Sequence, residues 1–315
     1  MERGSYLEVN KIGLSVVIPS FQSEMTLGRV VRDLHATLKA KKIVKFEILL
    51  ILDGPRDGTK KIAKELEAQF SQCRVIELTR NFGQHAAIYA GIHSSKYGLI
   101  ATMDDDGQHP ASAIPLLIAE MSPEVDIVYG TSLAEKHGAV RKIASRFFKI
   151  VLFRILGVGN AREISALRLF RRSLLQSVDL QKISVGVIDV PLHWNSTRIS
   201  TVAVQMSERA EGKSNYDLRS LSRFAIQMII SFSVKPLKFA LLLGLLGFFA
   251  SSILTIFYLY QYVTGRIEVA GFTTITILIT TMASIQLITL GVLGEYVGSI
   301  HQKSMGKPLF NIKES

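Results

Sequence analysis

The chain has 315 residues, of which 48% are hydrophobic, and its mean hydropathy of +0.28 is high for a soluble enzyme. Its formal net charge of +11 favours an anionic partner, such as lipid headgroups, a phosphorylated lipid or a nucleotide diphosphate. The one cysteine, Cys73, excludes an internal disulfide and is typical of a reducing compartment. The polar start shows no secretory signal, so we expect about the first 230 residues to stay in the cytosol.

Strand-like and helix-like segments alternate along the first hundred or so residues. Apolar runs that end in proline, aspartate or glycine turns predict strands at Leu14–Pro19, Phe46–Leu52, Arg74–Leu78 and Tyr97–Met103. Helical spacing of apolar residues predicts helices from Ser23 or Thr26 to Lys41, over Lys60–Phe70, and up to Ser95. This alternation with short connections predicts an α/β fold with a parallel, doubly wound sheet. The chain contains neither GxGxxG nor GxxxxGK[ST], which argues against dinucleotide and P-loop chemistry.

Carboxylates follow two of the predicted strands. The stretch Ala101–Pro110, ATMDDDGQHP, carries three consecutive aspartates, and Asp53, within LDGPRDGT, directly follows the predicted strand Phe46–Leu52. Ligands of open α/β sheets bind at the carboxyl ends of the strands. In an extended chain Asp104 and Asp106 point to the same side, and such crowded carboxylates favour a hard divalent cation. The alternative for the triple aspartate is a solvated acidic turn or a helix N-cap.

Four motifs occur in a fixed order: IPSFQSE, LDGPRDGT, RNFGQHAAIYAG and MDDDGQHP. In this order and spacing they resemble the signature series of glycosyltransferase family 2 with the GT-A fold. The resemblance extends from about Leu14 to Tyr296. It is strongest to the polyprenyl-phosphate glycosyltransferases, the group of dolichol-phosphate mannose synthase and the bacterial undecaprenyl-phosphate sugar transferases.

The resemblance implies a donor site that holds a UDP-sugar. Its nucleotide-binding residues would be Pro19, Glu24, Asp53 and Asp104, with Asp53 reading the uracil ring. Asp104 and Asp106 would be the DxD pair that faces an Mg²⁺ or Mn²⁺ ion on the donor diphosphate, with Gln108 close by. A metal ion neutralises the charge of a diphosphate leaving group without proton transfer. Asp53 alone would otherwise be interpreted as a turn aspartate.

The acceptor side is expected further along the chain. Ala139–Ile155 interleaves basic and apolar residues, which is typical of an amphipathic helix at an anionic membrane surface, although a solvated helix packed on the core is the alternative. In the family, residues matching Arg141 and Ser145 hold a phosphate of the lipid acceptor or donor. The segment Ser207–Tyr216 resembles the family's loop of an arginine followed by GxSKY. This resemblance implies that Arg209 contacts a phosphate and has a catalytic role, and that Lys213 also contacts a phosphate.

Two departures from the family pattern concern the acceptor site. The family usually has an aspartate before the arginine of its SGFR-like segment, but Arg162–Arg168 contains none, and Glu163 is the nearby acid. The chain also has Thr131 and Ser132 where the family commonly has an arginine. The identity of a general base is therefore open. A lipid phosphate is already anionic, so the reaction needs orientation and charge neutralisation more than proton abstraction.

Two uncharged runs, 239–265 and 269–294, are each long enough to cross a bilayer, which needs about 20 residues. Lysines flank this pair on both outer sides, so the positive-inside rule predicts a hairpin with both ends in the cytoplasm. Two buried core helices are the alternative. Leu218–Val234 is expected to form amphipathic interface helices. Small residues in the spans are compatible with a homo-oligomer through helix packing: Gly244, Gly247, Gly291 and Gly294.

Other polar residues receive structural interpretations. No zinc-ligand spacing occurs among His85, His109, Asp126 and Asp189, so we expect structural roles for them. Trp194 is expected on a strand. Glu295, near the end of the second span, is expected to reach the interface or to find a basic partner.

The sequence thus predicts a GT-A type doubly wound nucleotide-binding domain with amphipathic interface helices and a C-terminal two-helix transmembrane hairpin. The expected divisions are a cytoplasmic catalytic domain (1–206), a catalytic loop with interface helices (207–237), two transmembrane helices (238–300) and a cytoplasmic tail (301–315). The expected activity is inverting, metal-dependent transfer from a UDP-sugar to a polyprenyl phosphate by a multi-pass protein of the inner membrane, and the expected lipid is undecaprenyl phosphate. No nucleic-acid partner is expected. The alternatives are a non-catalytic membrane scaffold and a processive polysaccharide synthase, which the absence of QxxRW disfavours.

Overall fold

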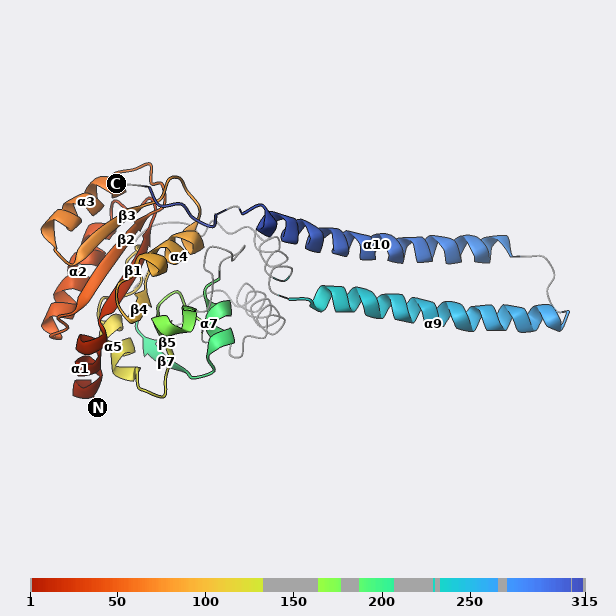
Figure 1. The fold of residues 1–315 in the computed structure, drawn as a ribbon, viewed down its shortest axis with the longest axis horizontal. Coiled ribbons are helices and arrows are strands. Elements are labelled where there is room, and N and C mark those ends of the chain that lie inside the picture. The colour runs from red at the N-terminus through yellow and green to blue at the C-terminus, as the bar shows by residue number, and fades with distance from the viewer. Residues whose placement is uncertain are drawn as a thin grey trace. The chain divides into compact units, whose positions relative to one another are not determined.

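The computed structural model divides into two compact units, one of residues 1–215 with 308–315, and one of residues 216–307 (Figure 1). It describes residues 2–132, 164–176, 187–206, 229, 233–265, 271–306 and 308–313.

The described elements of the first unit alternate between strands and helices up to β5. In chain order they are α1 (Glu2–Ile12), β1 (Leu14–Ser20), α2 (Leu27–Ala40), β2 (Phe46–Leu52), α3 (Thr59–Gln69), β3 (Cys73–Glu77), α4 (Gln84–Ser94), β4 (Leu99–Thr102), α5 (Ala113–Glu120), β5 (Ile127–Ser132), β6 (Arg168–Arg171), the 3₁₀ helix η1 (Arg172–Leu175), α7 (Asp189–Asn195) and β7 (Ile199–Val204). The predicted strands and helices of the first hundred residues are all present, and β2 has the predicted bounds.

The strands form one seven-stranded sheet in the order β3-β2-β1-β4-β6-β5-β7. All neighbouring pairs are parallel except those of β6, which is antiparallel to both β4 and β5. The prediction of a doubly wound α/β fold is confirmed, with the addition of this antiparallel strand. Because β1 and β4 are neighbours, the loops that follow them meet at the same edge of the sheet.

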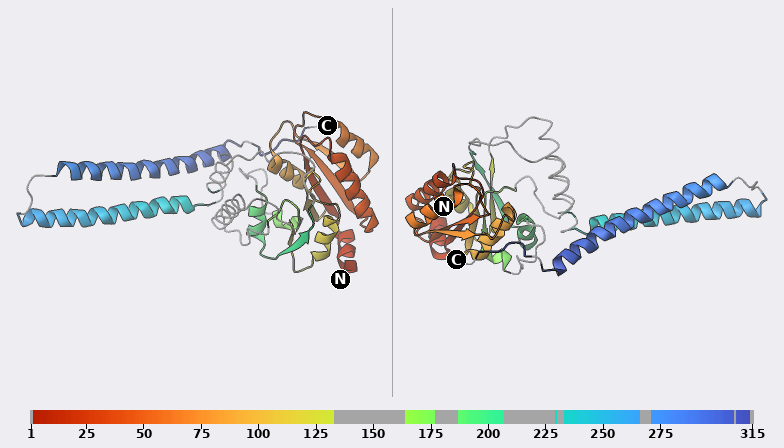
Figure 2. Two further views of the ribbon diagram at one scale, coloured as in Figure 1. Left: turned by 180° about the vertical axis from the view of Figure 1, so that it is seen from behind. Right: turned by 90° about the horizontal axis from the view of Figure 1, so that it is seen from above.

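Both faces of the sheet are covered, because the central strands are apolar on both sides. Ile48 and Leu50 of β2 belong to the core beneath α2, α3 and α5, whereas Leu49 and Ile51 belong to the core beneath α4 and α7. Figures 1 and 2 show α2 and α3 on one side of the strands and α4 on the other. Burial of each such aliphatic side chain contributes roughly 1.5–3 kcal/mol, so this double packing makes the sheet a rigid platform for its loops.

Two features differ from the sequence-based expectations. The polar start forms helix α1, whose Val9 is 1% exposed and whose Tyr6 hydroxyl donates to Pro115 O at 3.4 Å. The prediction that Trp194 lies on a strand is wrong: it lies in α7 and is 58% exposed. The helix accommodates Pro191 because this proline falls in its first turn, where no intrahelical N–H bond is lost.

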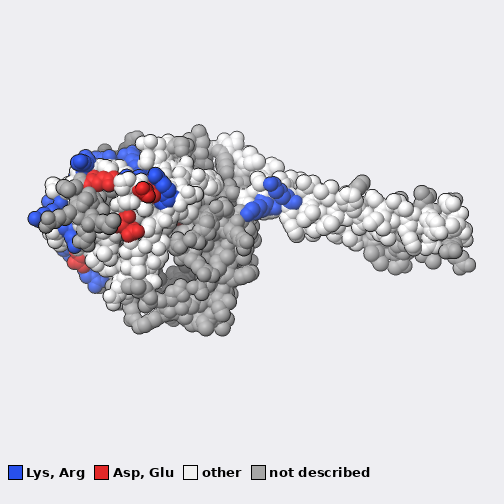
Figure 3. Space-filling view, turned by 90° about the horizontal axis from the view of Figure 1, so that it is seen from below, with Lys and Arg blue, Asp and Glu red and all other residues white. Residues whose placement is uncertain are grey.

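The second unit is a pair of long helices, α9 (Lys235–Val263) and α10 (Phe272–Ser304). Within them Lys235–Leu254 and Thr281–His301 are long and apolar enough to cross a membrane, by length and composition. The helices contact each other at Gly247, where an added Cβ would lie 3.5 Å from Met282 Cε. Lys235 and Lys238 lie in the first turn of α9, and Figure 3 shows basic side chains at one end of the hairpin. That the helices span a membrane stays a prediction.

Candidate active site

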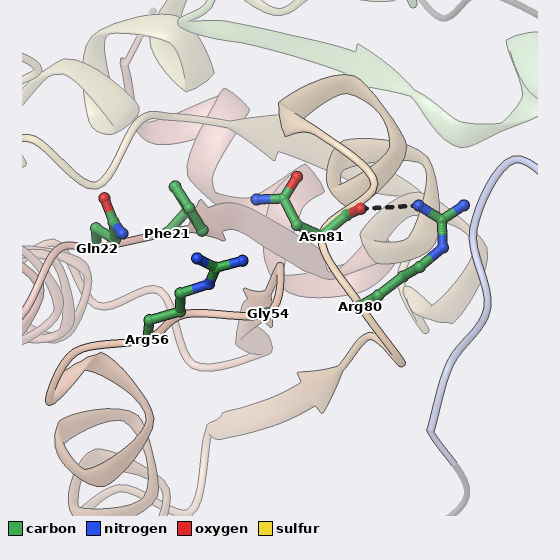
Figure 4. A pocket seen from close by; sticks show the side chains of 6 residues that line it. All are labelled: Phe21, Gln22, Gly54, Arg56, Arg80 and Asn81. Atoms are coloured by element: carbon green, nitrogen blue, oxygen red, sulfur yellow. Dashed lines mark hydrogen bonds between the residues drawn. The ribbon is translucent and has the colours of Figure 1, made fainter.

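Two adjoining pockets lie at the carboxyl ends of β1, β2, β3 and β4, the edge where ligands of open α/β sheets bind. The first has a volume of about 260 Å³ and is lined by Pro19, Ser20, Phe21, Asp53, Asn81, Gly83, Gln84, Asp104, Asp105 and Asp106. The second has a volume of about 460 Å³ and is lined by Phe21, Gln22, Gly54, Arg56, Arg80 and Asn81. Figure 4 shows the second pocket, with the Arg56 guanidinium pointing between Phe21 and Gly54. We call them the carboxylate pocket and the arginine pocket; they share Phe21 and Asn81.

The three aspartates follow the end of β4 and make different contacts. Asp104 Oδ1 accepts a hydrogen bond from Gln84 Nε2 at 2.8 Å, so α4 holds this carboxylate. Asp105 Oδ2 accepts from the backbone N–H of Phe21 at 3.1 Å, which ties the loop after β1 to the loop after β4. Asp106 Oδ1 accepts from the backbone N–H of Gln108 at 2.9 Å within its own turn. All three carboxylates nevertheless line one pocket.

The carboxylates are partly buried and line the same pocket. Burial raises the pKa of Asp104, and the charge of Asp106 raises it further, while His109 and Arg168 act in the opposite direction. Burial also raises the pKa of Asp105 to about 6. Adjacent carboxylates that are partly desolvated are stabilised by positive charge, which a hard divalent cation would supply. The oxygen donors of Asp104 and Asp106 therefore fit Mg²⁺ or Mn²⁺.

The protein offers this cation an incomplete ligand set. Among the residues that the structure describes, no group of three or more His, Cys, Asp or Glu side chains is arranged to hold a metal ion. Mg²⁺ commonly binds through one or two carboxylates together with substrate phosphates and water. The geometry thus fits an ion that is completed by a phosphorylated ligand.

Asp53, which directly follows β2, holds the loop after β3. It is 2% exposed, and its two oxygens accept from the backbone N–H groups of Phe82 at 2.7 Å and Gly83 at 2.8 Å. Gly54 has a φ of 62°, and an added Cβ there would lie 2.8 Å from Asn81 N. The backbone at Gly54 is therefore in direct contact with the backbone at Asn81. Asp53 and Gly54 together hold the segment that lines both pockets.

The structure brings together some of the expected donor residues. Pro19, Asp53 and Asp104 line the carboxylate pocket, whereas Glu24 is not among its lining residues. Glu24 Oε2 instead accepts from the Gly58 N–H at 2.6 Å, which joins the loop after β1 to the start of α3. The expected acceptor residues lie outside the described part of the chain: Arg141, Ser145, Arg209 and Lys213, together with Glu163.

A buried ion pair beneath the aspartates was not predicted. Arg168 is 3% exposed, and its Nη1 lies 2.5 Å from Asp189 Oδ1, which also accepts from the Tyr129 hydroxyl at 2.8 Å. Arg168 Nε donates to Thr102 Oγ1 at 3.1 Å, at the end of the strand that leads to the aspartates. One signal was available: Arg168 begins the strand RLFR next to two apolar residues, and an arginine that is buried there needs a counter-ion. The sequence does not say that α7 provides it.

Comparison with known proteins identifies the family. The model of glycosyl transferase family 2 matches residues 15–179. This chain belongs to glycosyl transferase family 2. The match contains β1 to β6 and therefore both pockets, and it makes the protein a glycosyltransferase.

Relatives of this family match almost the whole chain. An uncharacterized glycosyltransferase of Synechocystis sp. is 27% identical over 304 residues, 96% of this chain and 95% of that protein. The undecaprenyl-phosphate 4-deoxy-4-formamido-L-arabinose transferase of Pseudomonas paraeruginosa is 28% identical over 305 residues, 95% of this chain and 89% of that enzyme. These matches include the apolar hairpin, and they support the expected polyprenyl-phosphate group.

A solved structure supports the fold. Glucosyl-3-phosphoglycerate synthase of Mycobacterium tuberculosis, in complex with Mn²⁺, UDP and phosphoglyceric acid, aligns with a TM-score of 0.55 at 17% identity. The alignment covers 73% of this chain and 81% of that enzyme. The predicted GT-A architecture is confirmed on this basis.

Proposed function

We propose that this glycosyltransferase moves a sugar from a UDP-sugar to a polyprenyl phosphate, with inversion at the anomeric carbon. The observation that carries the proposal is the pocket of three aspartates beside a larger pocket at the carboxyl ends of β1 to β4. Such an arrangement suits a nucleotide diphosphate, whose phosphates need charge neutralisation. The relative from Pseudomonas paraeruginosa, named as an undecaprenyl-phosphate sugar transferase, supports undecaprenyl phosphate as the acceptor.

On the donor side, the proposal gives each pocket one part of the nucleotide. The diphosphate would lie in the carboxylate pocket, and Asp104 and Asp106 would hold Mg²⁺ or Mn²⁺ with Gln108 close by. The ion, when bound, neutralises the charge of the leaving diphosphate. The similar fold that binds Mn²⁺ and UDP supports this arrangement. Pro19 and Asp53 would contact the nucleoside, with Asp53 reading the uracil, and Glu24 would hold the loop beside them.

On the acceptor side, we assign the phosphate contacts to Arg141, Ser145, Arg209 and Lys213, which lie outside the described residues. An oxygen of the lipid phosphate would form a bond to the anomeric carbon, and the bond from that carbon to the UDP oxygen would break. The attacking phosphate is already anionic, so no side chain has to remove a proton. Orientation and charge neutralisation then supply most of the catalysis.

The apolar hairpin would anchor the enzyme in the inner membrane with its catalytic domain in the cytoplasm. Two helices that are long and apolar enough to cross a bilayer support this placement. A membrane anchor keeps the enzyme at the surface where a polyprenyl phosphate resides. The glycolipid product would serve as a sugar donor for cell-envelope glycan or lipid modification, and the enzyme would act as a homo-oligomer.

The test is a transfer assay on the full chain in detergent, with undecaprenyl phosphate, Mn²⁺ or Mg²⁺, and a panel of UDP-sugars and GDP-mannose. Mass spectrometry should find one monoglycosylated lipid that is absent with EDTA. A lipid carrying many sugars would instead indicate a processive synthase. If no donor yields a product although the folded protein binds UDP, the proposed reaction is refuted for this panel, and a scaffold that retains the fold becomes the better account.

A further inference from the structure

The C-terminal segment 308–313, which we call the tail, returns to the sheet and pairs with its outer edge. Ile312 forms an antiparallel bridge with Leu78, just beyond β3. Thr79 N donates to Asn311 O at 2.9 Å, and Lys313 N donates to Glu77 O at 2.8 Å. The tail thus covers the backbone groups of an edge strand that would otherwise face solvent.

Side chains hold the tail in place on the α4 side of the sheet. Phe310 is 5% exposed and belongs to the core of that side, with its ring 5.9 Å from the ring of His93. Leu309 and Ile312 pack against the same core. Lys313 Nζ lies 3.7 Å from Glu77 Oε1 at the surface. The buried ring of Phe310, with Leu309 and Ile312 packed against the same core, holds the tail in one defined position.

The segment bound by the tail leads directly into both pockets. Thr79, which donates to the tail, precedes Arg80 and Asn81, and these two residues line the arginine pocket. Figure 4 shows the tail, in blue, passing Arg80 on the side away from the pocket. Asp53 accepts from the next backbone groups, at Phe82 and Gly83. Residues 79–83 are therefore held from two sides, by the end of β2 and by the tail.

We propose that the tail is a positioning element of the donor site: by pairing with residues 77–79 it fixes residues 80–83, so nucleotide affinity depends on it. This inference rests on the proposed function, because it takes the two pockets as the nucleotide site. The tail follows α10 after residues 305–307. The segment that comes after the second apolar helix in the chain therefore also binds the strand end that leads to the pockets. A tail that only covered the sheet edge would affect stability and leave affinity unchanged.

The sharpest test separates the backbone of Lys313 from its side chain. Lys313→Pro removes the N–H that Glu77 O accepts, whereas Lys313→Ala keeps it and removes only the surface ion pair. Isothermal titration of the full chain in detergent with UDP and Mn²⁺ should show a Kd about fivefold higher for Lys313→Pro, the worth of roughly one net hydrogen bond. Lys313→Ala should stay within about twofold of the wild type.

A second measurement shows where the change occurs. In Lys313→Pro, hydrogen exchange should accelerate at the amides of Thr79 and Phe82 and stay unchanged in β1 and β4. Phe310→Ala should weaken UDP binding in the same way, and Phe310→Leu should restore most of it. If hydrogen exchange shows that the tail is released in Lys313→Pro but its UDP affinity equals that of the wild type, this inference is refuted and the proposed function is not. An equal loss in Lys313→Ala would overturn strand pairing as the cause, and a wild type that binds no UDP would overturn the proposed function itself.

Discussion

The carboxylate of Asp53 is expected to stabilise the loop after β3, and Asp53→Asn tests this. The amide keeps one oxygen acceptor but turns an NH₂ group toward one of the two backbone N–H groups, which in the wild type donate to the carboxylate at 2.7 and 2.8 Å. Loss of one hydrogen bond to a charged, buried acceptor costs about 1.5–3 kcal/mol. For a unit of this size each 1 kcal/mol lowers Tm by roughly 2–4 °C, so the expected decrease is about 3–12 °C.

Thermal unfolding of the full chain in detergent measures this decrease, with and without UDP. The matched control is Asp33→Asn, which removes an exposed carboxylate on α2 and should leave Tm within about 1 °C. If Asp53→Asn unfolds at the wild-type temperature but no longer binds UDP, the carboxylate does not hold the loop. It would then act only through its proposed contact with the uracil.

Three further predictions concern the folded unit. Burial, with the nearby charge of Arg168, lowers the pKa of His85 from 6.5 to about 4, so the unfolded chain takes up this proton first as pH falls. The free energy of unfolding is therefore unaffected by His85 above pH 6.5 and decreases between pH 6.5 and pH 4, by about 2 kcal/mol at pH 5. In thermal unfolding, the Tm of His85→Asn should fall less steeply with pH over this range than the Tm of the wild type. Gly54→Ala should cost about 2–4 kcal/mol, because it adds a Cβ at positive φ against Asn81, and a Tm decrease of less than 2 °C would contradict this. Arg168→Met should cost about 3–5 kcal/mol by leaving the Asp189 carboxylate buried and unpaired, and the double variant with Asp189→Leu should recover part of that loss in a thermal scan.

Local patterns in the sequence predicted the sheet well. The strand at 46–52 is apolar at every position except Glu47 and is followed by turn residues, so its limits follow from the local sequence. Trp194 was misplaced because the helix that carries it has only seven residues, too few for helical periodicity to stand out. The helix at 2–12 was missed because its interior contacts come from Val9 and Tyr6 against distant segments, and its composition is otherwise polar.

The sequence predicted which residues line the candidate site better than it predicted their hydrogen-bond and ion-pair partners. A cluster such as Asp104, Asp105 and Asp106 is visible in the sequence because its members are adjacent. The partners of Asp53 and of Arg168 are 29 and 21 residues away, and which backbone or carboxylate they meet depends on how strands and helices pack. The pairing of the tail with the edge beyond β3 joins residues more than 200 positions apart, and no local pattern reports it.

The central claim is that Asp104 and Asp106 carry the transfer of a sugar to a polyprenyl phosphate. The most direct measurement is the initial rate of glycolipid formation by the full chain and by three single variants, Asp104→Asn, Asp105→Asn and Asp106→Asn. We expect Asp104→Asn and Asp106→Asn to lose at least about a hundredfold in rate, whereas Asp105→Asn, whose amide oxygen can still accept the Phe21 N–H, should stay within about tenfold of wild type. A wild-type rate in Asp106→Asn, or equal losses in all three variants, would contradict the account.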